Sequence, residues 1–325
     1  MKLNPSYASV SLIALLALVL GACSQAVLPA GSGSNELTTL KIAVLPILDA
    51  LPMHVAQQAG LFEAHGVKVE FIPVGSAPER DQLISAGQAD GMINESVSTI
   101  FYNKDQVQVQ IVRYARAAAP EGALFSLLAS GKSGITTVDE LKGVEIGVSQ
   151  GTVIEYLNDR LLQTEGLAEG EIKVIAVPKL DYRLTLLGSG ELKAAVLPEP
   201  LASLAVLQGA KVILDDTRHP EYSYSTIAFR KVVIDRHPEA IRAFLAAIED
   251  ATLQINADPG QYNDLLLELK LIPLALDGIF KLPKFVTAGV PTEEQWNDSL
   301  VWTKQEGLVS KDVSYTDSVN ASFLP

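Results

Sequence analysis

Short apolar strands and helical stretches alternate along most of this 325-residue chain, and that order constrains its fold more than any other feature. A period of two between apolar and other side chains, typical of strands, occurs at Leu40–Val44, Val67–Phe71 and Val107–Ile111. Helical stretches lie between and after these strands, at Pro52–Ala59, Glu79–Ala86 and Ser96–Tyr102. Strands and helices in this order predict a parallel sheet with helices on its faces.

The same order of elements starts again after Gly143, which predicts a second α/β unit. Its strands are expected at Val144–Val148, Ile172–Val177, Ala194–Leu197 and Lys211–Leu214. Its helices are expected after a capping box at Thr152–Glu155 and at Arg183–Leu187 and Leu201–Leu207. Two such units suit the length of the chain, because domains contain about 150 residues each.

The chain changes character past Tyr224. One more strand is predicted at Ser225–Val233, and Pro238 then begins a long helix with apolar residues on one face. The helices that follow bring no new strand, and the last of them opens with a capping box at Thr292–Gln295. We expect this helical tail to cover the sheet of the first unit.

Two segments, Leu83–Glu95 and Leu186–Glu199, share one outline. Each is a helix end, a glycine, a short apolar strand and a turn with a glutamate; glycine and glutamate are eight residues apart in the first and nine in the second. This order of elements also recurs by coincidence in α/β domains. If the two segments are equivalent, Glu95 and Glu199 both stand at the carboxyl ends of parallel strands, where open α/β sheets bind ligands.

The start of the chain has the form of a signal peptide. Its apolar run, Val10–Leu20, spans about 16 Å as a helix, roughly half of a ~30 Å hydrocarbon core, which is too short to cross a membrane. Residues 1–22 are therefore predicted to be a secretory signal peptide. Residues 23–37 are rich in small and polar side chains and are predicted to be a flexible tether.

Cys23 is the only cysteine of the chain and lies three residues after the end of that apolar run. The segment Leu20–Cys23 resembles the bacterial lipobox, in which the cysteine becomes the first residue of the mature protein and carries a lipid. A buried or catalytic cysteine is the alternative, but a reactive thiol needs a histidine or a cationic side chain beside it, and the neighbouring sequence has none. We expect Cys23 to anchor the protein to a membrane.

The formal charge excludes some classes of partner. Loss of residues 1–22 removes Lys2 and changes the net charge by one unit, from −13 to −14. A chain this acidic repels nucleic acid and anionic lipid headgroups, so we expect no nucleic-acid partner and a membrane link through the lipid alone.

The residues that catalysis or metal binding requires are scattered. The four histidines, His54, His65, His219 and His237, are widely spaced, and the chain has no His-Glu-x-x-His motif. We therefore expect no catalytic residue, metal site or cofactor, and a binding protein in place of an enzyme.

Seven short segments occur in an order that resembles one protein family. They are Lys41–Val44, His54–Phe62, Gly66–Val67, Ala89–Met92, Val138–Gly143, Gly147–Thr152 and Val196–Pro200. With the lipobox, they resemble the solute-binding lipoproteins of bacterial ABC importers, in particular the group that includes nitrate-, sulfonate-, taurine- and thiamine-precursor-binding proteins. The resemblance covers most of residues 38–260.

The resemblance implies an α/β fold with two lobes, like that of periplasmic binding proteins, in which the chain crosses between the lobes twice. Lobe one would comprise residues 38–125 plus 224–325, and lobe two residues 126–223. It also implies a monomer that captures a small solute by hinge bending and delivers it to an ABC transporter permease. The protein would lie on the outer side of the cytoplasmic membrane, held by its lipid.

By position, the residues expected to face the cleft lie in turns after strands or near the two crossings. They are Asp49, Ser76, Asn94, Glu95, Arg113, Gln150, Thr152, Glu199, Tyr222 and Tyr224. Each also has a local alternative role: Asp49 and Thr152 as helix caps, Glu95 and Glu199 as exposed turn acids, and Arg113 as a salt-bridge partner.

The charges of this set bear on the class of ligand. Free amides at helix amino termini would suit an anionic group. However, the set contains three carboxylates and one arginine, which disfavours nitrate or a sulfonate. It favours a ligand with hydrogen-bond donors, such as an aminopyrimidine or another amine-bearing heterocycle, on whose ring a tyrosine would stack.

Two other functions are compatible with the same fold. One is an enzyme that works on menaquinone precursors, which the export signal disfavours because that chemistry belongs inside the cell. The other is a sensor protein that presents its solute to a membrane kinase. The sequence does not separate the sensor from an importer component.

Overall fold

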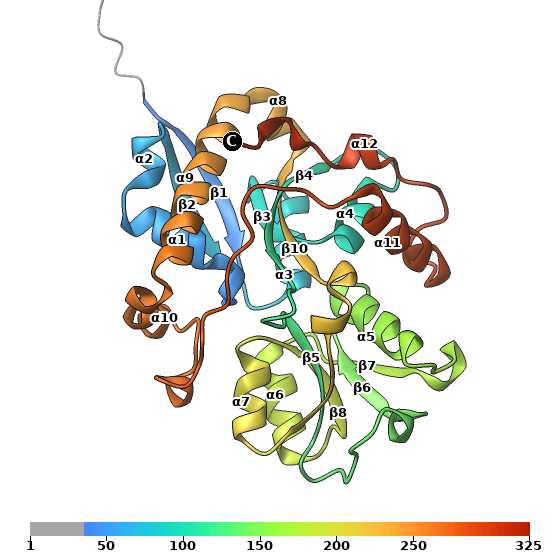
Figure 1. The fold of residues 1–325 in the computed structure, drawn as a ribbon. Helices are drawn as coiled ribbons and strands as arrows, with labels where there is room; N and C mark the ends of the chain where they lie inside the picture. Colours follow the sequence, from blue (N-terminus) through green and yellow to red (C-terminus); the bar gives the residue numbers. More distant parts are fainter. Residues whose placement is uncertain (1–35) are drawn as a thin grey trace, which may run out of the picture. The chain divides into compact units, whose positions relative to one another are not determined.

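The structure is a computed structural model that describes residues 36–325. The predicted signal peptide at residues 1–22, the predicted lipid site Cys23 and nearly all of the predicted tether at residues 23–37 lie outside the described residues. The described chain forms two five-stranded sheets, each with helices packed against it (Figure 1).

The first sheet has the strand order β2-β1-β3-β10-β4. Its strands are β1 Thr38–Val44, β2 Val67–Pro73, β3 Gly91–Asn94, β4 Val109–Ala117 and β10 Tyr224–Arg230. The pairs β1–β2 and β1–β3 are parallel, whereas β10 is antiparallel to both β3 and β4. The sheet is therefore mixed and not wholly parallel as predicted, because β10 returns from the other sheet and enters this one from the opposite end.

The second sheet repeats this arrangement in the order β7-β6-β8-β5-β9. Its strands are β5 Phe125–Ala129, β6 Glu145–Val148, β7 Lys173–Ala176, β8 Ala194–Pro198 and β9 Lys211–Asp215. The pairs β6–β7 and β6–β8 are parallel, and β5 is antiparallel to β8 and β9. The position of β5 between β8 and β9 matches that of β10 between β3 and β4.

The chain crosses between the two sheets twice. It leaves the first sheet after β4 and enters the second at β5, and it returns from β9 to β10. Each sheet and its helices form one lobe. The predicted two-lobed α/β fold with two crossovers is thus confirmed.

Helices cover the sheets in both lobes (Figure 1). In the first lobe they are α1 Leu51–Gln58, α2 Leu61–Ala64, α3 Ala77–Ser85, α4 Ser96–Asn103, α8 Lys231–Arg236, α9 Pro238–Ala257, α10 Asn263–Glu268, α11 Glu293–Gln305 and α12 Tyr315–Ser318. In the second lobe they are α5 Val153–Thr164, α6 Leu180–Ser189 and α7 Leu201–Leu207.

The helices after β10 contribute to the core of the first lobe. In α9, Phe244 and Ile248 pack in one buried cluster with Ile42 of β1. In α11, Trp296 packs in a second cluster with Met92 of β3. Both faces of the first sheet are therefore covered by residues far apart in the sequence, as expected for the tail.

Two strands differ most from their predicted bounds. The strand expected at Val107–Ile111 is β4, which starts two residues later and continues to Ala117. The strand expected at Ser225–Val233 ends at Arg230, where α8 begins. In α8, Lys231 pairs with Asp235 one turn later, which favours a helix over an extended chain.

No helix within residues 36–325 has the length and apolar character needed to cross a membrane.

Candidate functional site

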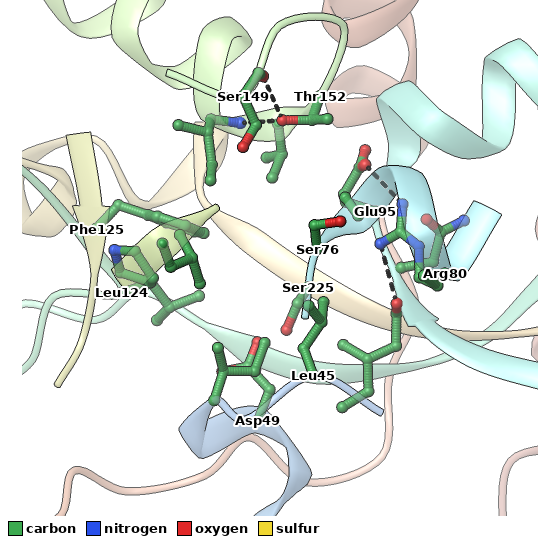
Figure 2. Close-up of a pocket in the computed structure, with 18 of the residues that line it drawn as sticks. Leu45, Asp49, Ser76, Arg80, Glu95, Leu124, Phe125, Ser149, Thr152 and Ser225 are labelled. Carbon is green, nitrogen blue, oxygen red and sulfur yellow. Dashed lines mark hydrogen bonds and ion pairs between the residues drawn. The ribbon is translucent and has the colours of Figure 1, made fainter. Parts of the chain in front are cut away.

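A cavity of about 80 Å³ lies where the carboxyl ends of strands from both lobes meet (Figure 2). Its lining comes from the carboxyl ends of β3 and β8, from turns that follow strands, from the starts of α3, α5 and α6, and from residues of β5 and β10 at the crossovers. The lining residues are Leu45, Ile47, Asp49, Ser76, Ala77, Arg80, Ile93, Asn94, Glu95, Leu124, Phe125, Ser149, Thr152, Val153, Ile154, Pro178, Leu180, Pro198 and Ser225. The cavity is thus mostly apolar, with a few polar groups on each wall.

Arg80 and Glu95 form the charged part of the first-lobe wall. The Arg80 guanidinium donates to the carbonyl of Ile93 at 3.1 Å and pairs with Asp81 at 2.8 Å and with Glu95 at 3.8 Å. The other carboxylate oxygen of Glu95 accepts from the amide of Ser98 at 2.8 Å and so caps α4. Burial raises the pKa of Glu95 to about 7, although Arg80 and the Ser98 amide oppose that rise.

The same wall has an excess of hydrogen-bond acceptors. Within the described part of the chain, Asn94 Oδ1 and Glu95 Oε1 are buried without a hydrogen-bond partner. The Asn94 amide nitrogen is already engaged, because it donates to Thr99 at 3.0 Å. A buried acceptor without a donor is costly, so this wall is suited to a ligand that brings donors.

Ser149, Thr152 and Arg183 form the polar part of the second-lobe wall. Thr152 caps α5 and donates to the carbonyl of Ser149 at 2.7 Å. Behind the wall, Arg183 donates to Ser149 Oγ at 2.6 Å and to the carbonyl of Val196 at 2.8 Å. No carboxylate among residues 36–325 pairs with Arg183, and burial lowers the pKa of its guanidinium to about 10.

Arg80 and Arg183 occupy equivalent places in the two lobes. Each lies on a helix and donates to a strand carbonyl 13 residues later, that of Ile93 in β3 or that of Val196 in β8. They differ in charge balance, since Arg80 has two carboxylate partners. Within residues 36–325, two carboxylates therefore accompany the first-lobe arginine, whereas the arginine behind the second-lobe wall has none.

The floor of the cavity is fixed to the crossovers by two buried carboxylates. Asp49 accepts from Arg116 at 3.3 Å. Asp216 accepts from the amides of Leu124 and Phe125 at 3.0 and 2.9 Å, and from the hydroxyl of Ser223. Asp216 thus joins the outgoing crossover to the returning one.

Five of the ten residues predicted to face the cleft line this cavity. They are Asp49, Ser76, Asn94, Glu95 and Thr152. Thr152 has its alternative role as well, because it caps α5. Ser76 and Glu95 also cap the helices that follow them, and Glu95 is buried and not an exposed turn acid. A capping side chain after a strand is held at the edge of the sheet, where it also faces the cavity.

Arg113 and Gln150 do not line the cavity. Arg113 is buried on β4, pairs with Glu249 of α9 at 2.6 Å and donates to the carbonyl of Val286 at 3.2 Å. Arg113 therefore has its alternative role, that of a salt-bridge partner. Gln150 is exposed in the turn before α5.

Tyr222 and Tyr224 also lie away from the cavity. Tyr222 packs edge-on against Tyr156 of α5, with ring centroids 6.2 Å apart. Tyr224 is buried, and its hydroxyl hydrogen-bonds with Ser96 at 2.9 Å. Tyr224 is enclosed by protein groups and Tyr222 is half-buried, and neither ring lines this cavity.

Glu199 faces a different groove, of about 730 Å³, between α7 and the segment that contains Leu276 and Phe280. The strand registers pair Ile42 with Gly91 and Ile146 with Ala194, so Pro198, not Glu199, is the counterpart of Glu95. The second segment has one more residue between its glycine and its glutamate, so Glu199 lies one position beyond the counterpart of Glu95. Because successive residues of an extended chain point to opposite sides, the side chain of Glu199 points away from the cavity.

Arg80, Ser149 and Phe125 are lining residues that the sequence reasoning missed. A signal for Arg80 exists in the sequence: Arg80 precedes Gly87, and Arg183 precedes Gly190, by the same seven residues. The similarity between the segments Leu83–Glu95 and Leu186–Glu199 therefore extends back to an arginine in each lobe.

The lining residues include neither histidine nor cysteine. Within residues 36–325, no group of three or more His, Cys, Asp or Glu side chains is placed to hold a metal ion. The chemistry available at the cavity is recognition by hydrogen bonds, charge and apolar contact.

Comparison with known proteins agrees with this geometry. A protein of Brachyspira hyodysenteriae named as an ABC transporter periplasmic binding protein is 23% identical over 273 residues, 80% of this chain and 76% of its own length. The alkanesulfonate-binding protein SsuA of Xanthomonas axonopodis pv. citri, solved with MOPS, shares the fold with a TM-score of 0.75 and 16% identity, over 87% of this chain and 98% of that chain.

The fold also occurs in an enzyme. The structure of the desulfurization enzyme DSZB matches with a TM-score of 0.67 and 13% identity, over 88% of this chain and 97% of its own. The fold is that of the type II periplasmic binding proteins. The NMT1/THI5-like family model matches residues 48–262, about two thirds of the sequence, and the chain therefore belongs to the NMT1/THI5-like family.

Proposed function

We propose that this protein is the extracytoplasmic solute-binding component of an ABC importer and holds one small organic solute between its lobes. The observation that carries the proposal is a cavity at the carboxyl ends of β1, β3, β6 and β8, with walls from both lobes. The relative named as an ABC transporter binding protein supports the same function.

Two walls on separate lobes supply a mechanism for capture. Hinge motion at the two crossovers would separate them, so the open form makes only half of the contacts of the closed form. For a protein that is 99% open without solute, the solute would have to favour the closed form by about 5.5 kcal/mol to make it 99% closed. Contacts between the lobes that form without solute lower this requirement. The permease would then recognise the closed form.

We further propose that a lipid on Cys23 anchors the protein on the outer side of the cytoplasmic membrane. The support is the lipobox-like segment and the acidic net charge, which disfavours direct contact with anionic headgroups. Mass spectrometry of the N-terminal peptide tests this. A diacylglycerol-modified cysteine is expected, and a chain that starts elsewhere or keeps residues 1–22 would contradict it.

The solute itself is proposed to carry hydrogen-bond donors, as in an amine-bearing heterocycle. Within the described part of the chain, Asn94 and Glu95 have two buried acceptors without hydrogen-bond partners on the first-lobe wall, and Asp49 adds a carboxylate at the floor that Arg116 pairs with. Nitrate or a sulfonate group brings no hydrogen-bond donor, so neither anion would satisfy the buried acceptors of Asn94 and Glu95.

A thermal-shift panel of amines, heterocycles, sulfonates and oxyanions tests the function. A true solute at 100 times its dissociation constant stabilises the protein by about 2.7 kcal/mol. The hit should bind at one site per chain, lose affinity in Glu95→Gln and be recovered unchanged after incubation. Chemical conversion of the hit would favour an enzyme, and unchanged affinity in Glu95→Gln would remove the basis for the donor class.

A further inference from the structure

A direct contact joins the two lobes away from the cavity. Helix α5 belongs to the second lobe and α11 to the first, yet Tyr156 of α5 and Trp302 of α11 pack edge-to-face with ring centroids 5.6 Å apart. Both side chains are about 1% exposed, and Val97 of α4 completes their cluster. Two aromatic rings from different lobes are thus buried only while the lobes stay together.

Polar contacts flank these rings on both sides. The indole nitrogen of Trp302 donates to Asp159 at 2.8 Å. Asp298 of α11 accepts from the hydroxyl of Tyr156 at 2.6 Å and pairs with Arg160 at 2.8 Å. We call these five residues the α5–α11 clasp.

Separation of the two lobes would leave polar groups of the clasp without their hydrogen-bond partners. Asp159 is 9% exposed, and within residues 36–325 its carboxylate is the acceptor for the Trp302 indole. Burial raises the pKa of Asp159, and the Trp302 and Asn158 hydrogen bonds oppose that rise. Loss of the Trp302 contact removes a donor that offsets the burial of this carboxyl group.

The clasp also controls one wall of the cavity. Thr152, Val153 and Ile154 line the cavity at the amino terminus of α5, and Tyr156 lies about half a turn farther along the same helix. None of the clasp residues lines the cavity. Because the clasp contacts fix the middle of α5, the first turn of this helix keeps one position at the cavity, whether or not a solute is present.

We propose that Tyr156, Asp159, Asp298 and Trp302 are positioning residues for solute binding: they hold the lobes together independently of the solute and place the first turn of α5 over the cavity. The part about the solute rests on the proposed function. The part about the lobes does not, because it concerns the protein alone.

The chain supplies its own reporter, since it has two tryptophans and both lie on α11. Trp296 is buried within the first lobe and donates to the carbonyl of Val313 at 3.1 Å, whereas Trp302 contacts the second lobe. Protein labelled with 5-fluorotryptophan gives one ¹⁹F resonance for each. The resonance of Trp302 is assigned by its loss in Trp302→Phe, and Trp296 reports whether the first lobe is still folded.

The experiment measures broadening of both resonances by a soluble gadolinium chelate, together with small-angle X-ray scattering, on the full chain without added solute. Wild type and Asp159→Asn, which keeps an oxygen acceptor, should leave Trp302 protected. Asp159→Leu combined with Tyr156→Phe should broaden Trp302 at least tenfold more than Trp296 and increase the radius of gyration. Asp298→Ala, at a position 35% exposed, should act in the same direction with less risk to folding.

The proposal is overturned if Trp302 stays protected and the scattering curve is unchanged in both Asp159→Leu/Tyr156→Phe and Asp298→Ala while Trp296 keeps its wild-type resonance. That result leaves the solute-binding function standing. Failure to find any solute leaves the clasp standing, because no solute enters this measurement.

Discussion

Glu95 makes a testable link between burial and pH. It is 4% exposed, caps α4 and has a pKa of about 7, against an ordinary value of 4.5. The folded state therefore binds more protons than the unfolded state between these two values, and the free energy of unfolding falls as the pH rises through this window. Between pH 5 and pH 8 the loss from this one group is about 2.5 kcal/mol.

Glu95→Gln isolates that contribution. The amide oxygen of glutamine still accepts from the Ser98 amide, and the side chain is neutral at every pH. The free energy of unfolding of Glu95→Gln minus that of wild type is therefore expected to rise by about 2.5 kcal/mol between pH 5 and pH 8. The measurement is urea denaturation at a series of pH values, with circular dichroism as the signal.

The matched control is Glu239→Gln, whose carboxylate is 88% exposed on α9. Water already solvates that group, so the difference between variant and wild type should stay within about 0.5 kcal/mol across the series. A difference for Glu95→Gln that is independent of pH, or that falls as the pH rises, would refute the reasoning about Glu95.

Three further substitutions test the supports of the cavity by urea denaturation. Arg183→Met leaves three buried acceptors without their donor and should cost about 3 kcal/mol; a loss below about 1 kcal/mol would contradict this. Asp216→Ala frees the amides of both crossover residues and one hydroxyl, so a similar loss is expected, and wild-type stability would count against its role. Gly91→Ala places a Cβ 2.6 Å from the ring of Phe229 and should cost about 1–3 kcal/mol, whereas a neutral result would mean that β3 can shift.

Much of the fold was predictable because periodicity reports local structure. The repeated strand and helix pattern gave two α/β units, and the capping boxes at Thr152 and Thr292 start α5 and α11 as expected. The antiparallel strand β5 was missed, since its five residues, Phe125–Ala129, are all buried and show no alternation. The strand directions were also missed, because a crossover that returns from another lobe leaves no local signal.

The site was only partly predictable, since turns after strands are visible in sequence and side-chain directions are not. Ser76 and Thr152 were found because they lie in turns after strands, and each caps the helix that follows it. Arg80 was missed because it lies on a helix and not in a turn after a strand. The residue whose carbonyl holds its guanidinium, Ile93, is 13 positions away in the sequence. Glu199 was expected at the cavity, but one extra residue turns it toward another groove.

The central claim, one solute held between two lobes, is tested most directly by native mass spectrometry of the full chain. The solute found in the thermal-shift panel should appear as one adduct per chain. Ala77→Trp, which fills the cavity, should abolish the adduct, and Ala257→Trp, at an exposed position on α9, should keep it. An adduct that survives Ala77→Trp in full would contradict the account, because the solute would then lie elsewhere.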